Sequence, residues 1–352
     1  MSYQLNEKVR NLVPYEPISG SYRIRLDANE SFLEISPKMK AEILARISEV
    51  HLNRYPDPTA SGVCVKAGNY LKVRPEQITV GNGSDELLTL ITQTLMSKGE
   101  KLVYTSPDFS MYKMYGYLAE IDCVEYKKDE NFNIDVDALI ALIQKEAART
   151  VIFSNPCNPT GVGLPRAEVL RLVEGVPECL VVVDEAYMEF WDQSVLDCVE
   201  KYDNLMVLKT CSKAFRMAGI RCGLAIANTV LTNALRAAKS PYNVNSMTQA
   251  AAEAMFEFPD ELDLAIRVVK DSRDELYRAV RALADRYPDK LSLLPTAANF
   301  VFVKFQSGEA KRIFEGMKAE RVVVRCMGDY LRITCGTESE NKEVVRLLEE
   351  LL

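Results

Sequence analysis

The chain has 352 residues, 48% of them hydrophobic and 26% charged, which predicts one large domain or two with a sizeable core. The formal net charge of −7 gives no general affinity for nucleic acid, so local arginine or lysine would have to hold any anionic ligand. The single histidine, His51, argues against Ser-His-Asp hydrolysis and against histidine-rich zinc or iron sites.

The chain carries no signal for export or membrane insertion. Residues 1–14 are polar and mixed, no run of 18 apolar residues occurs, and the nine cysteines form no Cys-x-x-Cys pair. We therefore expect a cytoplasmic protein with reduced thiols and without a membrane span.

The middle of the chain alternates short apolar runs with helical patterns. Helices are predicted from residue 84 and over residues 135–148, and strands at residues 78–80, 101–105, 121–126, 150–154, 180–184, 205–209 and 222–227. Because these strands are continuously apolar and separated by helices, they predict a largely parallel α/β sheet buried on both faces.

The last third has a different pattern, which predicts a smaller α+β domain. Its helices are expected at residues 261–286, 308–318 and 338–352, and its strands at 299–304, 321–325 and 331–334. The first 45 residues are too few for a domain and are expected to pack onto the C-terminal part. The division is thus an arm at 1–45, a large domain at 46–245 and a small domain at 246–352.

The segment Gly81-Asn82-Gly83-Ser84-Asp85-Glu86 follows a predicted strand and opens a helix. Free backbone N–H groups and the helix dipole favour an anion at such a start, and Ser84 is expected to cap the helix and to touch a phosphate. The segment is neither a dinucleotide fingerprint nor a P-loop. Taken alone, it also fits an ordinary strand–turn–helix.

A rigid turn, Asn155-Pro156-Cys157-Asn158-Pro159-Thr160-Gly161, follows the strand at residues 150–154. The next strand delivers Asp184 and, three residues on, Tyr187 to the same edge of the sheet, where ligands bind in open parallel sheets. A carboxylate there needs a cationic or N–H partner, and a protonated pyridine nitrogen suits it. A metal is the alternative, but no cluster of His or acidic residues supports it.

The segment from Thr210 to Gly223 places Lys213 after a strand, among hydroxyls and small residues. A partly desolvated lysine near cations has a free amine for Schiff-base chemistry, whereas a lone loop lysine is usually solvated. Thr210, Ser212 and Arg221 are expected to converge on one phosphate.

These four segments, in this order, resemble the fold-type I aminotransferases that depend on pyridoxal 5′-phosphate (PLP), and the resemblance covers nearly the whole chain. It implies a large domain with a mainly parallel seven-stranded sheet, a smaller α+β domain, and Lys213 as the catalytic lysine that carries PLP as a Schiff base. The cofactor-binding residues that it implies are Ser84, Asp85, Tyr112, Asn158, Asp184, Tyr187, Thr210, Ser212, Lys213 and Arg221.

The resemblance also implies individual roles. Arg221 binds the cofactor phosphate, Asp184 pairs with the pyridine nitrogen, and Tyr187 and Asn158 bind the phenolic oxygen. Lys213, once displaced by the substrate amine, acts as the general base.

An aromatic side chain from residues 107–112 is expected to stack on the cofactor ring. Tyr112 is the first choice for this position and Phe109 the second.

Within that family the chain is most similar to the histidinol-phosphate aminotransferases, in residues 11–15, 26–30, 53–57, 241–244, 298–300 and 331–337. The similarity implies that Tyr55 reaches the cofactor of a neighbouring subunit, which predicts a homodimer with shared sites. Arg332 is expected to bind the acidic end of the substrate, and Arg325 and Tyr15 its phosphate. An ion pair on the surface is the alternative for Arg325.

The implied reaction converts L-histidinol phosphate and 2-oxoglutarate to imidazole-acetol phosphate and L-glutamate in histidine biosynthesis. Transamination of aromatic amino acids and decarboxylation of threonine phosphate stay open, since related enzymes catalyse them. A DNA-binding sensor and a nicotinamide dehydrogenase are disfavoured, because the chain lacks a helix-turn-helix before residue 30 and the glycine fingerprint.

Overall fold

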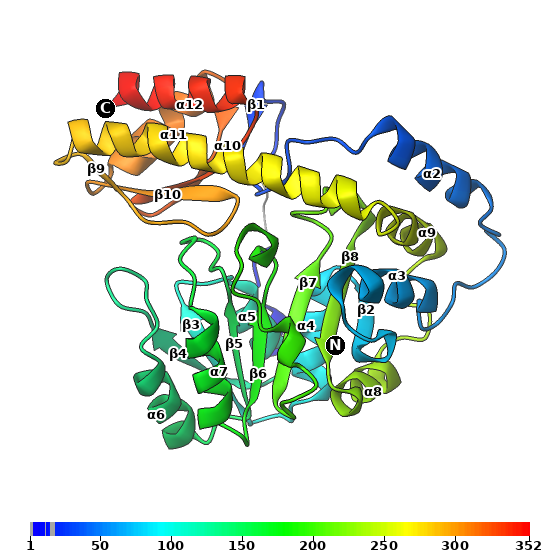
Figure 1. The fold of residues 1–352 in the computed structure, drawn as a ribbon. Helices are drawn as coiled ribbons and strands as arrows, with labels where there is room; N and C mark the ends of the chain where they lie inside the picture. Colours follow the sequence, from blue (N-terminus) through cyan, green and yellow to red (C-terminus); the bar gives the residue numbers. More distant parts are fainter. Residues whose placement is uncertain (1–2, 11, 15–17) are drawn as a thin grey trace.

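A seven-stranded sheet forms the framework of the large domain in the computed structural model, which describes residues 3–10, 12–14 and 18–352 (Figure 1). In spatial order its strands are β2 (Ile78–Asn82), β8 (Cys222–Ala227), β7 (Leu205–Thr210), β6 (Leu180–Asp184), β5 (Thr150–Ser154), β3 (Lys101–Ser106) and β4 (Asp122–Lys127). Strand β8 is antiparallel to both neighbours and the other pairs are parallel. The predicted mainly parallel sheet is confirmed, and β5, β6 and β8 have the predicted bounds.

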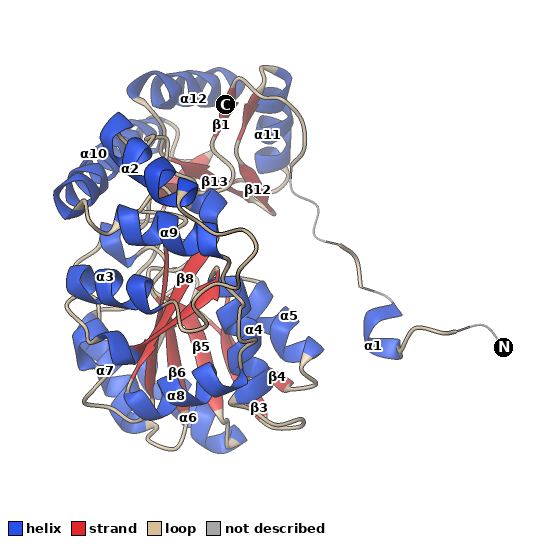
Figure 2. Ribbon diagram, turned by 90° about the vertical axis from the view of Figure 1, so that its right-hand side faces the viewer, coloured by secondary structure: helices blue, strands red, loops and turns tan. Residues whose placement is uncertain are grey.

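Helices cover both faces of this sheet (Figure 2). On one face lie α4 (Ser84–Thr94), α5 (Met111–Leu118) and α8 (Thr229–Ala238), and on the other α3 (Ser61–Leu71), α6 (Val136–Glu146) and α7 (Arg166–Gly175). Along β6, Val181 and Val183 join the core under α7, whereas Val182 joins the core under α4. The strand is therefore buried on both faces, as its unbroken apolar run predicts.

A smaller α+β unit lies beyond the carboxyl ends of the parallel strands (Figure 1). Its antiparallel sheet has the order β12 (Arg325–Met327), β13 (Tyr330–Thr334), β10 (Phe300–Phe305) and β9 (Leu291–Leu293). It is accompanied by α10 (Pro259–Arg286), α11 (Glu309–Ala319) and α12 (Glu338–Leu351). The α+β character predicted for the last third is confirmed.

The single strand predicted at 321–325 is wrong, because the chain changes partners within it. Strand β11 (Val322–Val323) pairs in parallel with β1 (Ile24–Arg25), and β12 pairs with β13. The β1–β11 pair forms a separate two-stranded sheet that joins the N-terminal segment to the chain just before β12, and so positions residues 26–30 above the large sheet.

The remaining helices belong to neither of these groups. They are α1 (Glu7–Arg10), α2 (Pro37–Ser48), α9 (Ser246–Met255) and the short 3₁₀ helices Pro75–Gln77, Met188–Phe190, Leu196–Cys198 and Ala218–Ile220. Helix α2 is capped by the Ser36 hydroxyl, which accepts from the Met39 N–H, and it packs against α9. Among the helices in the described part of the chain, none is long and apolar enough to cross a membrane.

Candidate active site

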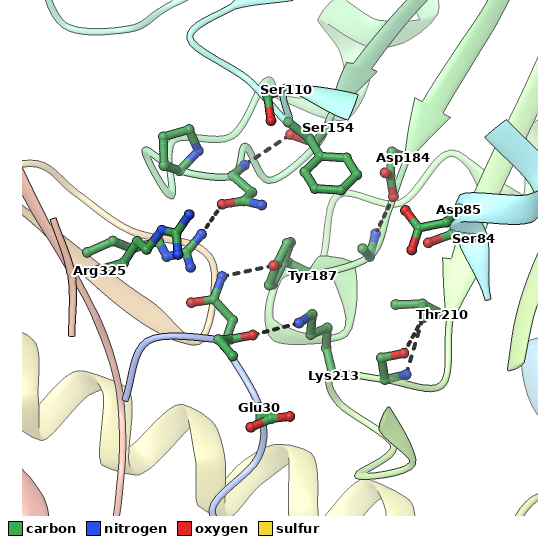
Figure 3. Close-up of a pocket in the computed structure, with 18 of the residues that line it drawn as sticks. Glu30, Ser84, Asp85, Ser110, Ser154, Asp184, Tyr187, Thr210, Lys213 and Arg325 are labelled. Carbon is green, nitrogen blue, oxygen red and sulfur yellow. Dashed lines mark hydrogen bonds between the residues drawn. The ribbon is translucent and has the colours of Figure 1, made fainter. Parts of the chain in front are cut away.

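A cavity of about 560 Å³ opens between the carboxyl ends of the large sheet and the small antiparallel sheet. Ser84, Asp85 and Thr210 lie on one side of it, Arg325 lies on the opposite side, and Lys213 and Tyr187 lie between them (Figure 3). The predicted site residues that line this cavity are Ser84, Asp85, Tyr112, Asn158, Asp184, Tyr187, Thr210, Ser212, Lys213, Arg221, Arg325 and Arg332.

Lys213 enters the cavity from the loop that follows β7. The backbone N–H of Cys211 donates to the Cys222 carbonyl at 2.9 Å and so extends the β7–β8 pairing to the start of this loop. The Lys213 ammonium donates to the Ala28 carbonyl at 2.8 Å. The amine therefore meets the segment at residues 26–30, which closes the cavity from the small-domain side.

The side of the cavity at α4 is built to bind an anion. The Arg221 guanidinium donates to the Ser212 hydroxyl at 3.3 Å and lies 3.4 Å from an Asp85 carboxylate oxygen. Gly83 precedes α4 with φ 82°, and a Cβ there would lie 2.6 Å from the Arg221 guanidinium. Glycine thus suits this backbone conformation and lets the Arg221 guanidinium approach without having to shift.

The expectation that Ser84 caps this helix is wrong. The N-cap residue is Gly83, and Ser84 is the first residue of the helix itself. The glycine takes this place because the turn needs a positive φ, which serine adopts only with strain. The Ser84 N–H is consequently one of the amide groups at the helix start that favour an anion.

Asp184 ends β6 as a buried carboxylate with two donors. The Tyr112 hydroxyl donates to one oxygen at 2.8 Å, and the Ala186 N–H donates to the other at 3.1 Å. Burial raises the pKa of Asp184 to about 6, although these hydrogen bonds favour the charged form. A cation placed against Asp184 would hold it ionised, as the protonated nitrogen of a pyridine ring does.

Tyr112 lines the cavity, but its side chain is buried in the wall. Tyr112 is 0% exposed, and its hydroxyl is engaged by Asp184. Phe109 is only partly buried, lines the cavity and meets the Tyr112 ring edge to face at 5.6 Å. Phe109 is therefore the aromatic ring available to a flat ligand, and Tyr112 fits a role as hydrogen-bond donor.

Asn29 is a site residue to which the sequence analysis gave no role. Its side-chain amide donates to the Tyr187 hydroxyl at 2.9 Å, and its own N–H donates to the Thr334 hydroxyl at 3.1 Å. Asn299 donates to the Asn29 carbonyl at 3.1 Å. The sequence did contain a sign of this role, since Asn29 lies in the motif at residues 26–30. It adopts φ 54°, a conformation that asparagine tolerates better than most residues.

Two arginines project from neighbouring strands of the small sheet. Arg325 on β12 and Arg332 on β13 are direct partners in the antiparallel register. Arg332 donates to the side-chain oxygen of Asn158 at 2.5 Å and to the Asp27 carbonyl at 2.6 Å. Since opposite residues of such a pair point to the same face, both guanidinium groups belong to one face of the sheet.

The structure places one predicted site residue, Tyr55, away from this cavity. Tyr55 is 79% exposed and stacks on Tyr242, with ring centroids 4.3 Å apart. It does not line the cavity of its own subunit. Tyr15 lies outside the described residues.

Fold and site together define a two-domain α/β enzyme that presents a lysine amine, a buried carboxylate and an anion-binding helix start to one ligand. The model of the family "Aminotransferase class I and II" matches residues 23–348, and the chain belongs to this family. The resemblance inferred from the sequence motifs is confirmed.

Curated relatives match over nearly their full length. A histidinol-phosphate aminotransferase of Clostridium kluyveri is 38% identical over 351 residues, which cover 98% of each chain. One from Pyrococcus furiosus is 34% identical over 346 residues, which cover 98% of this chain and 97% of the relative.

Solved structures share the fold. The crystal structure of histidinol-phosphate aminotransferase from Sinorhizobium meliloti in complex with pyridoxal-5′-phosphate has a TM-score of 0.88 to this chain at 22% identity. The match covers 99% of this chain and 97% of that one. The predicted fold is therefore confirmed.

Proposed function

We propose that this chain transfers the amino group of L-histidinol phosphate to 2-oxoglutarate, giving imidazole-acetol phosphate and L-glutamate, in histidine biosynthesis. The cofactor is PLP. The curated relatives named for this enzyme support the proposal. The structural observation that carries it is the cross-strand pair of Arg325 and Arg332 at the cavity wall.

Two like charges directly opposite each other in a sheet repel each other, so an anionic ligand that contacts both is favourable. A phosphate dianion accepts charge-assisted bonds from both guanidinium groups, whereas one arginine is enough for one carboxylate. The pair therefore favours a phosphorylated amine as donor, with the side-chain carboxylate of glutamate occupying the same place in the second half-reaction.

The residues fit PLP at three points. The start of α4, with Ser212 and Arg221, suits the cofactor phosphate, and Gly83 leaves the room that Arg221 needs there. Asp184 is a buried carboxylate that lacks a cationic partner among the hydrogen bonds described above, which suits a protonated ring nitrogen. Phe109 offers its ring to the face of the cofactor.

When bound, PLP supplies an electron sink that stabilises negative charge on the carbon beside the amino nitrogen. Lys213 would hold the cofactor through its amine, and that amine, once free, would take the proton from the substrate carbon. Asp184 would keep the ring nitrogen protonated, and the hydroxyl of Tyr187, oriented by Asn29, would serve the phenolic oxygen together with Asn158. Arg332 and Arg325 bind the acidic end of the substrate and so orient the bond to be broken.

The proposal includes a cytoplasmic homodimer with shared sites, in which Tyr55 of each subunit reaches the cofactor phosphate of the other. The exposed position of Tyr55 supports this role, since a residue serving its own cavity would have to line it. We further propose that Tyr15 contacts the substrate phosphate. The proposed division of the chain is an arm at 1–45, a large domain at 46–245 and a small domain at 246–352.

The experiment that tests the function is a panel of amino donors, each incubated with the purified holoenzyme and 2-oxoglutarate. Histidinol phosphate should give the highest kcat/KM for glutamate formation, ahead of phenylalanine, tyrosine and threonine phosphate. A higher kcat/KM with an aromatic amino acid, or release of carbon dioxide from threonine phosphate, would contradict the proposal.

A further inference from the structure

A buried ion pair lies in the cavity wall, outside the residues discussed so far. Lys128 follows β4, and its ammonium lies 3.1 Å from a carboxylate oxygen of Asp108. Both side chains are 1% exposed. Asp108 itself lines the cavity and immediately precedes Phe109. Neither residue has a place in the chemistry derived above.

The surroundings satisfy the lysine completely. Its ammonium has three donors, and it contacts three acceptors: the Asp108 carboxylate, the Pro107 carbonyl at 3.0 Å and the Cys157 sulfur at 3.0 Å. Burial is the largest single influence on the pKa of Lys128 and lowers it, but the contacts with Asp108 and Cys157 together outweigh burial, so the pKa lies above its usual value. The group is therefore held as a cation in one orientation.

The Asp108 carboxylate, held in place by Lys128, forms hydrogen bonds with residues of the candidate active site. It accepts from the Ser154 hydroxyl and from the Ser154 and Phe109 N–H groups, the last at 2.8 Å. The Ser154 hydroxyl in turn accepts from the Asn158 N–H at 3.0 Å (Figure 3). The side chain of Asn158 accepts from Arg332.

Burial of an ion pair is a poor way to gain stability. Two well-packed apolar side chains of similar volume often serve the fold as well or better. The pair lies at the cavity wall. Asp108 directly precedes Phe109, whose ring is available to the cofactor, and it is hydrogen-bonded to Ser154. This location favours a role in the active site rather than in stability alone. Ser154 is also the register partner of Asp184 across β5 and β6.

The charges near Asp184 also favour a role for the Lys128–Asp108 pair in the active site. Burial is the main cause that raises the pKa of Asp184, and the Asp108 carboxylate adds to the rise. The Lys128 cation beside Asp108 offsets this second negative charge near Asp184. Asp108 can then serve as a fixed hydrogen-bond acceptor without making Asp184, the carboxylate that faces the cofactor nitrogen, harder to ionise.

We propose that Lys128 is a positioning residue, which acts through Asp108 to hold Phe109, Ser154 and Asn158 in place for the cofactor and the substrate. The inference rests on the proposed function for its substrate but not for its cofactor. Cofactor binding to the apoenzyme therefore tests it even where the donor panel fails.

The experiment compares Lys128→Met, Asp108→Asn and the double variant with the control Lys101→Met. Lys101 pairs with Glu146 at 2.7 Å near the surface on β3 of the same sheet, so its loss removes an ion pair without touching the cavity. Three quantities are measured for each: the Tm of the apoenzyme, the Kd for PLP titrated into the apoenzyme, and kcat/KM with histidinol phosphate.

Lys128→Met leaves Asp108 buried without its cation and should lower the Tm, and the neutral double variant should recover it. The double variant should still bind PLP more weakly and lose about tenfold to a hundredfold in kcat/KM, because small misplacements are costly at a reacting centre. Lys101→Met should keep wild-type values for the Kd and kcat/KM. A double variant with the wild-type Kd and kcat/KM would reduce the pair to a structural role and overturn the proposal. If Lys128→Met does not fold, Asp108→Asn and the double variant decide the question.

Discussion

The Tyr112 hydroxyl donates a hydrogen bond to the Asp184 carboxylate across 2.8 Å, and both side chains are buried. This contact holds Tyr112 buried in the cavity wall, whereas Phe109 is only partly buried there. It also favours the charged form of a carboxyl group whose burial favours the neutral one. The balance between the two effects can be measured.

Asp184→Asn should change how the stability of the apoenzyme depends on pH. The carboxyl group titrates near 3.8 when unperturbed and at about 6 when folded, so the folded state holds the extra proton between these values and loses stability as pH rises through them. The variant lacks this titration. The free energy of unfolding of the variant, relative to that of the wild type, should therefore increase from about pH 4 to about pH 7, by up to about 3 kcal/mol.

Denaturant unfolding of both apoenzymes across this pH range measures the effect. A difference between variant and wild type that does not change with pH would contradict it. The holoenzyme gives the opposite comparison, because Asp184→Asn should weaken PLP binding by removing the partner of the ring nitrogen.

Gly83→Ala should weaken the binding of the cofactor phosphate. The added Cβ would lie 2.6 Å from Arg221 and would have to displace its guanidinium. Gly99→Ala is the matched control, because Gly99 has φ 81° and nothing within 4 Å of an added Cβ. Both variants should lose about 1 kcal/mol of stability from the strained backbone.

Titration of PLP into the two apoenzymes separates strain from displacement. Gly83→Ala should show a raised Kd, and Gly99→Ala should keep the wild-type Kd. Equal Kd values for the two variants would show that the room beside Arg221 is not needed for the phosphate.

Arg325→Gln should discriminate between the two substrates of the reaction. Loss of a charge-assisted bond costs about 1.5–3 kcal/mol, so kcat/KM for histidinol phosphate should fall about tenfold to a hundredfold, and that for glutamate should fall less. Arg332→Gln should impair both. Equal losses for both substrates would argue against a phosphate role for Arg325.

Hybrid dimers test whether Tyr55 serves the neighbouring subunit. A dimer of one Lys213→Ala and one Tyr55→Ala subunit has one site with an intact lysine and an intact partner tyrosine. Refolding the two variants together should thus give more activity than the sum of the two separate preparations. Activity that stays at that sum would place Tyr55 outside the shared site.

The strands of the large sheet and the residues at their carboxyl ends could be predicted from the sequence, because each apolar run leads directly into a polar motif. Asp184 ends β6 and Lys213 follows β7 by three residues, so their positions depend only on strands that are easy to recognise. The roles of the small-sheet arginines, in contrast, were predicted only from the resemblance of their segments to histidinol-phosphate aminotransferases.

What could not be predicted depends on local geometry or on distant partners. Helix α5 begins at Met111, so Tyr112 lies in the helix with its hydroxyl on Asp184 and Phe109 lies in the preceding turn, and the sequence pattern does not fix this boundary. The strand predicted at 321–325 is interrupted because its first half pairs with β1, which lies some 300 residues earlier in the chain. Lys128 lies 20 positions from Asp108, and a lysine in a loop after a strand carries no local sign of burial.

The most direct test of the account concerns the bond between Lys213 and the cofactor. The holoenzyme is reduced with borohydride, digested and analysed by mass spectrometry. The account predicts that the mass of reduced PLP is found on the peptide containing Lys213 and is absent from the Lys213→Ala variant. Attachment to another lysine, or a reduced protein that carries no cofactor mass, would contradict it.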